Sequence, residues 1–162
     1  MYKAKELDLG LPLLESALLS NAAHVDRAVD AVLQTNQRKI AFLGLAFKAG
    51  TDDLRESPQV QMIKRLLGEG RSVRIWDRHV SLGRLVGSNR QYIEEVIPHI
   101  GSLLSSEFEE VVHGAEVVLV ATKIANNRLA RCLRPDQIII DLVNLDPARR
   151  PAVPGPYQGI CW

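Results

Sequence analysis

Continuous apolar runs constrain the fold of this chain more than any other feature. Residues 39–47 (KIAFLGLAF) and 115–121 (AEVVLVA) contain scarcely a polar side chain, and residues 137–144 (QIIIDLVN) follow a similar pattern. Strands that are buried on both faces of a parallel sheet have this composition. We therefore predict a buried strand in each run, and a further, shorter strand at residues 72–77 (SVRIWD).

Amphipathic segments separate the predicted strands. Residues 57–70 (SPQVQMIKRLLGEG) predict a helix with Ser57 as its N-cap and Pro58 at the first helical position. Further helices are predicted at residues 89–97, 107–114 and 126–133. Strands that alternate with helices in this way predict an α/β fold, specifically a Rossmann-like doubly wound parallel sheet with right-handed crossovers.

A long amphipathic helix precedes the alternating region. Apolar residues recur at helical spacing across residues 13–33, and charged residues fall between them. We predict a helical arm over residues 1–36 and a Rossmann-like domain over residues 37–162. The apolar stripe of the helix predicts self-association. Prolines crowd residues 147–156, so we expect an irregular tail whose apolar end, GICW, docks on the domain.

Composition excludes several classes of protein. The 162 residues carry a net charge of +1, which suggests no nucleic-acid partner, and no apolar run approaches the length of a membrane span. The N-terminus does not have the pattern of a secretory signal, so we expect a cytoplasmic protein. The two cysteines make neither a disulfide framework nor a zinc site. No metal site is expected, because the histidines are scattered, at His24, His79, His99 and His113.

The stretch GLAFKAGTDDLRESP, residues 44–58, follows the first buried strand at the edge where open α/β sheets bind ligands. It lacks both the dinucleotide-binding glycine fingerprint and the Walker Gly-Lys-Ser/Thr. Lys48 offers a compact cation for a phosphate or an oxyanion. Arg55 offers a planar guanidinium group that can bind a phosphate, a carboxylate or an amide through two hydrogen bonds. Asp52 and Asp53 can equally pair with these cations. The composition of the loop therefore leaves open both a ligand site and a self-satisfied structural corner.

Two polar residues end other predicted strands. Asp77 ends the second strand, where Rossmann folds often hold a ribose with an acid, but without the glycine fingerprint a structural role is favoured. Lys123 follows the third strand and is a weaker candidate for lining the cleft. Cys132 falls on the apolar side of a predicted helix and is interpreted as a buried thiol. Cys161 has no histidine or lysine near it in sequence to activate it.

The same stretch resembles the C-terminal domain signature of the nucleotide-sugar 6-dehydrogenases, the UDP-glucose/GDP-mannose dehydrogenase family. The family pattern G-L-x-F-K-x-x-T-D-D-x-R-x-S is met at every fixed position. Residues 92–104 (YIEEVIPHIGSLL), residues 141–143 (DLV) and the terminal GICW are similar to the branch that acts on GDP-mannose. The resemblance runs nearly from end to end and centres on a long motif.

The resemblance implies that the chain corresponds to the last third of a longer enzyme. That enzyme would oxidise GDP-mannose to GDP-mannuronate with two NAD, which bind mainly to an N-terminal domain. The family's nucleophilic cysteine lies in a segment that this chain lacks, so we expect the chain alone to be inactive. The arm would be the end of the central region that builds the homodimer. Two alternatives are a UDP-sugar 6-dehydrogenase domain and a non-catalytic binding or assembly module of the same fold.

The resemblance also assigns roles to residues of the motif. The motif lysine contacts the sugar-nucleotide, and this role carries over to Lys48, with Phe47 beside it. The motif arginine reaches toward the NAD held by the other domain, and this role carries over to Arg55. Asp53 is the residue that we expect to orient Arg55. No residue of this chain is assigned to the chemical step itself.

Overall fold

The computed structural model describes residues 10–46, 54–55, 57–80, 83, 85, 87–124, 126–145 and 155–160. This part of the chain forms a five-stranded sheet in the order β2-β1-β3-β4-β5, and every neighbouring pair is parallel. The strands are β1 (Lys39–Leu43), β2 (Ser72–Trp76), β3 (Val117–Val120), β4 (Ile138–Asp141) and β5 (Tyr157–Gly159). The predicted Rossmann-like α/β fold is confirmed.

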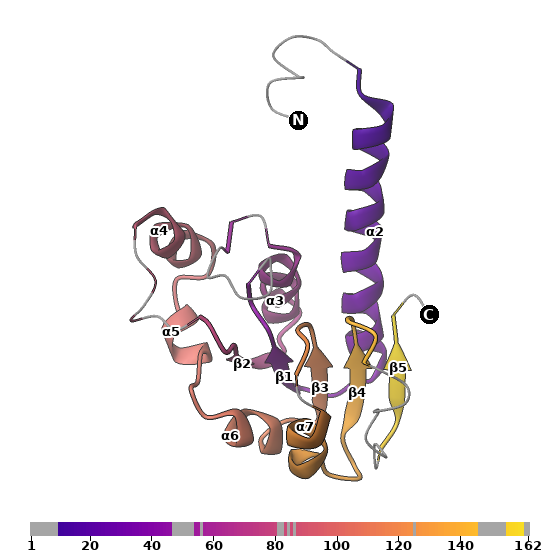
Figure 1. Ribbon diagram of the computed structural model, residues 1–162, viewed down its shortest axis with the longest axis vertical. Helices are drawn as coiled ribbons and strands as arrows, with labels where there is room; N and C mark the ends of the chain where they lie inside the picture. The colour runs from indigo at the N-terminus through magenta and orange to yellow at the C-terminus, as the bar shows by residue number, and fades with distance from the viewer. Residues whose placement is uncertain are drawn as a thin grey trace.

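Helices cover both faces of this sheet (Figure 1). They are α2 (Pro12–Gln34), α3 (Pro58–Gly68), α4 (Gly87–Val96), α5 (Ile100–Leu103), α6 (Phe108–His113) and α7 (Asn126–Cys132). Alternate residues of each strand enter two separate cores. Phe42 and Leu119 belong to the core that includes α2 and α3, whereas Leu43 and Val120 belong to the core that includes α6 and α7. The central strands β1, β3 and β4 are mostly apolar because both of their faces are covered, whereas the edge strand β2 exposes Ser72 and Arg74.

The strand order places a topological switch point between β1 and β3. From β1 the chain crosses to β2 at one edge, and later it returns to β3 on the other side of β1. The register pairs Leu43 with Val120, so the two strands end side by side. In open α/β sheets the crevice beyond such a point is where ligands bind. The loop after β1 therefore leaves from the part of the sheet best placed for a site.

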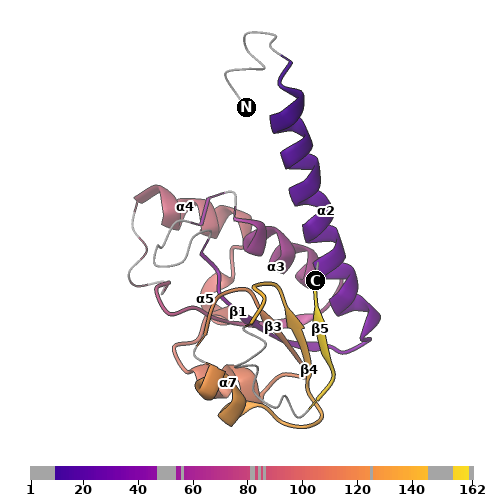
Figure 2. The same cartoon turned by 45° about the vertical axis from the view of Figure 1, so that its right-hand side comes forward.

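Helix α2 is anchored along only part of its length. Its C-terminal half is buried against α3 and the sheet through Val25, Ala28, Val29, Ala31 and Val32. The N-terminal half extends beyond the rest of the described chain (Figures 1 and 2). It exposes large apolar side chains, with Leu13 at 83% and Leu19 at 72% exposure. The helix prediction is confirmed to within one residue at each end, whereas the division into two units at residue 36 stays a prediction.

Two sequence-based expectations are wrong. The strand predicted for residues 39–47 stops at Leu43, because Gly44 takes a φ of +106° and turns the chain. The tail is not irregular throughout, because residues 157–159 form β5 at the edge of the sheet. Hydrogen bonds to β4 hold β5, among them the one that the Ile160 amide donates to Asp141 O at 3.0 Å. So short a strand has no periodic signal of its own, and pairing alone defines it.

Among the described residues, no helix combines the length and the apolar character that crossing a bilayer requires.

Candidate functional site

The loop that carries the family motif, residues 44–58, is called the motif loop. Its first support is the contact between the C-terminal ends of β1 and β3. A Cβ atom built on Gly44 would lie 2.7 Å from Cβ of Thr122, closer than side chains approach one another. The Gly44 amide donates a hydrogen bond to Trp76 O at 2.8 Å, which ties the same residue to β2. Glycine is required here both by its positive φ and by the lack of space. Gly44 thus fixes where the loop leaves the sheet.

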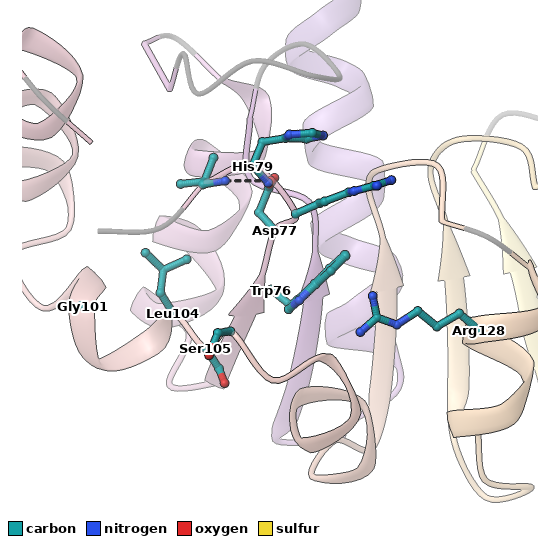
Figure 3. Close-up of a pocket in the computed structure, with 10 residues that line it drawn as sticks. Trp76, Asp77, His79, Gly101, Leu104, Ser105 and Arg128 are labelled. Carbon is teal, nitrogen blue, oxygen red and sulfur yellow. Dashed lines mark hydrogen bonds between the residues drawn. The ribbon is translucent and has the colours of Figure 1, made fainter. Parts of the chain in front are cut away.

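The second support is the carboxylate of Asp77, at the end of β2. Its Oδ2 accepts hydrogen bonds from the amides of Leu45 at 2.6 Å and Ala46 at 3.2 Å. Its Oδ1 accepts from the amides of His79 at 2.7 Å and Val80 at 3.1 Å (Figure 3). Because both oxygens are engaged by backbone amides, the structure favours the structural role of Asp77 over ribose binding.

The third support closes the far end of the loop. The buried Ser57 hydroxyl lies 3.0 Å from Leu45 O and 2.8 Å from Gln59 Oε1, and its single proton can be donated to either. The Ser57 amide donates to O of the fully buried Leu54 at 3.2 Å. Ser57 is the N-cap of α3 by position, but its hydroxyl makes no capping hydrogen bond. The predicted N-cap position is therefore confirmed, while the side chain joins the two ends of the loop instead of capping the helix.

The structure places some of the predicted site residues and not others. Arg55 lies in an exposed turn between the buried Leu54 and Ser57, so its backbone is anchored on both sides. Phe47, Lys48, Asp52 and Asp53 lie outside the described residues, and their roles stay predictions. Lys123 is exposed and directly follows Thr122, the residue that contacts Gly44. Arg55 and Lys123 therefore both follow the strands that form the switch point.

A cavity of about 300 Å³ lies beside the end of the motif loop. It is bounded by α2, by the N-terminal turn of α3 and by the segments that follow β4 and β5. The lining consists of Asn21, His24, Val25, Ala28, Pro58, Gln59, Met62, Leu142 and Ile160. A mostly apolar wall with a few polar groups is typical of a site for a small molecule. Sequence reasoning missed this cavity, although it had noted the DLV and GICW segments that contribute Leu142 and Ile160.

A buried carboxylate shapes the β4 side of this cavity. Asp141 is fully buried, and its Oδ1 accepts a hydrogen bond from the Val143 amide at 2.8 Å. Its Oδ2 accepts from the Leu145 amide at 2.7 Å and from the Tyr157 hydroxyl. These bonds fold the chain into a tight turn after β4 and attach β5 to it. Leu142, a cavity residue, sits inside that turn.

The described cysteine is not suited to nucleophilic catalysis. Cys132 is buried in the core formed with α6 and α7, which confirms the sequence-based interpretation. Burial raises the pKa of its thiol, and the negative charge of Glu109 adds to the effect. The reactive thiolate is therefore disfavoured. Cys161 lies outside the described residues, and among the described residues no group of His, Cys, Asp and Glu side chains could hold a metal ion.

Comparisons with known proteins agree with this geometry. The family model described as "UDP-glucose/GDP-mannose dehydrogenase family, UDP binding domain" matches residues 41–145. The chain is 41% identical to GDP-mannose 6-dehydrogenase of Pseudomonas syringae pv. syringae, over 99% of this chain and 37% of the relative. It is 29% identical to UDP-glucose 6-dehydrogenase of Rickettsia bellii, over 68% of this chain and 25% of the relative.

Solved structures of related enzymes have the same fold as this chain. The crystal structure of a ternary complex of GDP-mannose dehydrogenase from Pseudomonas aeruginosa matches with a TM-score of 0.80 and 39% identity, over 99% of this chain and 36% of that chain. A UDP-glucose dehydrogenase from Pyrobaculum islandicum, at 21% identity and a TM-score of 0.71, shares the fold over 99% of this chain and 35% of that chain. The chain thus spans well under half the length of these relatives. The chain belongs to the UDP-glucose/GDP-mannose dehydrogenase family.

Proposed function

We propose that this chain is the sugar-nucleotide-binding part of an NAD-dependent GDP-mannose 6-dehydrogenase, which oxidises GDP-mannose to GDP-mannuronate. The observation that carries the proposal is the 41% identity to a GDP-mannose 6-dehydrogenase over 99% of the chain. The UDP-glucose 6-dehydrogenase of Rickettsia bellii reaches 29% over only 68%. The protein would act in the cytoplasm and supply a polysaccharide-forming pathway with an oxidised sugar nucleotide.

The substrate would bind between the motif loop and the cavity beside α3. Lys48 and Phe47 would contact it from the loop, and the cavity of about 300 Å³ would receive part of it. The N-terminal turn of α3, which lines that cavity through Pro58 and Gln59, adds the partial positive charge of a helix N-terminus. Gly44, Asp77 and Ser57 hold the two ends of the loop in place for this contact. Substrate phosphates would therefore meet both a side-chain cation and oriented backbone dipoles.

NAD would be bound mainly by a separate domain of the full protein. This placement is supported by the acid at the end of β2, which is engaged by four backbone amides and not held ready for a ribose. The exposed Arg55 fits a more limited role, in which one cation reaches an anionic cofactor from across a domain boundary. Asp53 would orient it. The catalytic cysteine would also lie outside this chain, so the chain alone would be inactive.

The exposed half of α2 would form the homodimer. Leu14 and Leu18 lie one helical turn apart on the exposed half, and the same face continues into the buried residues Val25 and Ala28. Helix α3 covers this apolar stripe along the C-terminal half of α2, and the stripe is exposed along the N-terminal half. A second copy of the helix would bury it.

Isothermal titration calorimetry tests the substrate. We expect GDP-mannose to bind more tightly than UDP-glucose, and K48A to weaken GDP-mannose binding by about tenfold or more, as expected for a lost charge-assisted hydrogen bond. K64A, which removes an exposed lysine from α3, is the matched control and should bind as the parent chain does. Tighter binding of UDP-glucose would instead support the UDP-sugar enzyme. No binding by this chain or by the full-length protein would support a non-catalytic assembly module.

A further inference from the structure

A second, larger cavity lies beyond the end of β2. Its volume is about 470 Å³, within the range of sites that take small molecules. It is bounded by the segment that follows β2, by α5 and the residues after it, and by α7 (Figure 3). It shares no lining residue with the cavity beside α3. Nothing in the proposed dehydrogenase function uses it.

The lining of this cavity contains two arginines. Arg78, His79 and Arg128 contribute cationic or protonatable groups, and Asp77 is the single acid in the lining. The Asp77 carboxylate accepts four backbone hydrogen bonds, and among the described residues no ion pair joins it to either arginine. Arg78 is exposed, and no ion pair within the described residues engages it. An incoming anion therefore finds a donor that is not already committed to a partner in this part of the chain.

Ser105 and Ser106 line the cavity on the side of α5. The acids near this wall are occupied. Glu107 receives the Ser106 hydroxyl at 3.1 Å, and Glu110 pairs with Arg74 at 3.2 Å. Both serine hydroxyls therefore already donate to carboxylates, Ser106 to Glu107 and Ser105 to Glu110 at 3.5 Å. The donor that this rim offers to a phosphate is the guanidinium of Arg78.

An aromatic and guanidinium platform forms the floor. The Trp76 and Phe108 rings meet edge to face with centroids 4.9 Å apart. The Arg128 guanidinium carbon lies 5.3 Å from the Trp76 centroid and 4.4 Å from the Phe108 centroid, and its Nη2 pairs with Glu109 at 3.3 Å. Figure 3 shows Arg128 directed toward Trp76. Held from two sides, the guanidinium presents a flat surface, and planar bases stack on such surfaces.

We propose that this cavity binds a nucleoside monophosphate. The phosphate would be held by Arg78, and the base would stack on the Arg128–Trp76 platform. The two parts of such a ligand match the two kinds of wall, a polar cationic rim and a flat floor. Because this cavity is separate from the one assigned to the substrate, the nucleotide would be an effector and not a reactant.

The test uses the tryptophan in the floor. The chain contains two tryptophans, so W162F leaves Trp76 as the only one. Fluorescence of that variant is titrated with GMP, AMP, guanosine and inorganic phosphate, and nucleotide absorbance is corrected with a free tryptophan analogue. We expect saturable quenching by at least one of the two monophosphates, weaker quenching by guanosine, and none by inorganic phosphate. R78A should weaken the monophosphate by about tenfold or more.

Two further variants separate this site from others. R90A removes an exposed arginine of α4 that pairs with Glu94, and it should leave the titration unchanged. K48A should also leave it unchanged, although it is expected to weaken GDP-mannose binding, so the two proposals fail independently. The proposal is overturned by absence of saturable quenching up to millimolar nucleotide, by quenching that K48A removes, or by equal affinity in R78A. Inorganic phosphate that displaces the nucleotide at equal affinity would show an anion site only and would overturn it too.

Discussion

The Cα of Gly44 faces Thr122 so closely that a methyl group cannot be placed between the ends of β1 and β3. A Cβ on Gly44 would lie 2.7 Å from Thr122 Cβ and 3.0 Å from the Thr122 amide nitrogen. The positive φ of +106° adds backbone strain to any side chain there. The switch point of the sheet is therefore closed by a contact that only glycine permits.

The first prediction concerns this contact. Gly44→Ala should reduce the free energy of unfolding by about 2–3 kcal/mol, from backbone strain and from separation of the two strands. Urea denaturation measures it. Gly68→Ala is the control, because the last residue of α3 has open space around it and a helical backbone, and alanine should raise stability slightly. Equal stability of the Gly44→Ala chain would mean that β1 and β3 separate without cost.

The second prediction concerns Asp77, which joins the motif loop to the segment after β2. Asp77→Asn replaces an oxygen by an NH₂ group, which cannot accept from the amides that it faces. We expect a loss of about 1–3 kcal/mol in stability, and faster hydrogen exchange at the Leu45 and Ala46 amides. Hydrogen exchange read by NMR is the measurement. Asp30→Asn, at an exposed position of α2, should change neither quantity.

The third prediction concerns the attachment of β5. Tyr157→Phe removes the hydroxyl that donates to the buried Asp141 carboxylate, and the expected loss of stability is about 1.5–3 kcal/mol. The effect should be local, so the Ile160 amide, which donates to Asp141 O, should exchange faster. Tyr92→Phe on α4 serves as the matched control. Unchanged exchange at Ile160 would show that β5 is held without the hydroxyl.

The fourth prediction concerns pH. Hydrogen bonds from the amides of Lys39 and Arg38 lower the pKa of Glu116 below its ordinary value of 4.5. A carboxyl whose pKa is depressed by folding stabilises the protein above its unfolded pKa, and this stabilisation is lost as the pH falls through the folded value. Glu116→Gln should therefore reduce the acid-side slope of stability below about pH 4.5, measured by urea denaturation across pH. An identical slope in both chains would contradict the prediction.

The fifth prediction concerns the uncovered half of α2. The double variant Leu14→Glu, Leu18→Glu places charges on the stripe assigned to the dimer, so it should sediment as a monomer where the parent chain sediments as a dimer. Ala23→Glu puts the charge on the opposite face of the helix and should leave the dimer intact. A monomeric parent chain would remove the basis for placing the homodimer on this helix.

The sequence predicted what depends on local periodicity. The apolar runs at β1, β3 and β4 and the stripe of α2 were identified because burial on two faces, or on one helical face, leaves a repeating pattern. The roles of Ser57 and Asp77 were not, since each depends on a partner brought close only by folding. Ser57 contacts Leu45 across the loop, and Asp77 contacts the same segment from the neighbouring strand.

The candidate site, too, was predicted from the sequence only in part. The motif identified Arg55 and the loop in which it lies, because a long contiguous pattern survives in the linear sequence. The cavities could not be predicted from the sequence, since their walls come from three or four separate segments. Trp76 illustrates the limit: in the sequence it is one more apolar residue in a short strand, and only the approach of Arg128 makes it a platform. Phe47, Lys48 and Asp53 stay predictions of the motif alone.

Because α2 is anchored only along its C-terminal half, a small rotation there moves the N-terminal end of the helix over a larger distance. A helix of 23 residues is about 35 Å long, and roughly half of it stands clear of the domain. A change of about 5° in the packing of Ala28 or Val29 would therefore move Leu13 by about 2 Å, by simple rotation of a rod of that length. Small residues in the anchored half, such as Ala28, allow close contact with the domain, and this contact fixes the angle of the helix. The direction in which the free leucines point is thus set far from the leucines, inside the core of the domain.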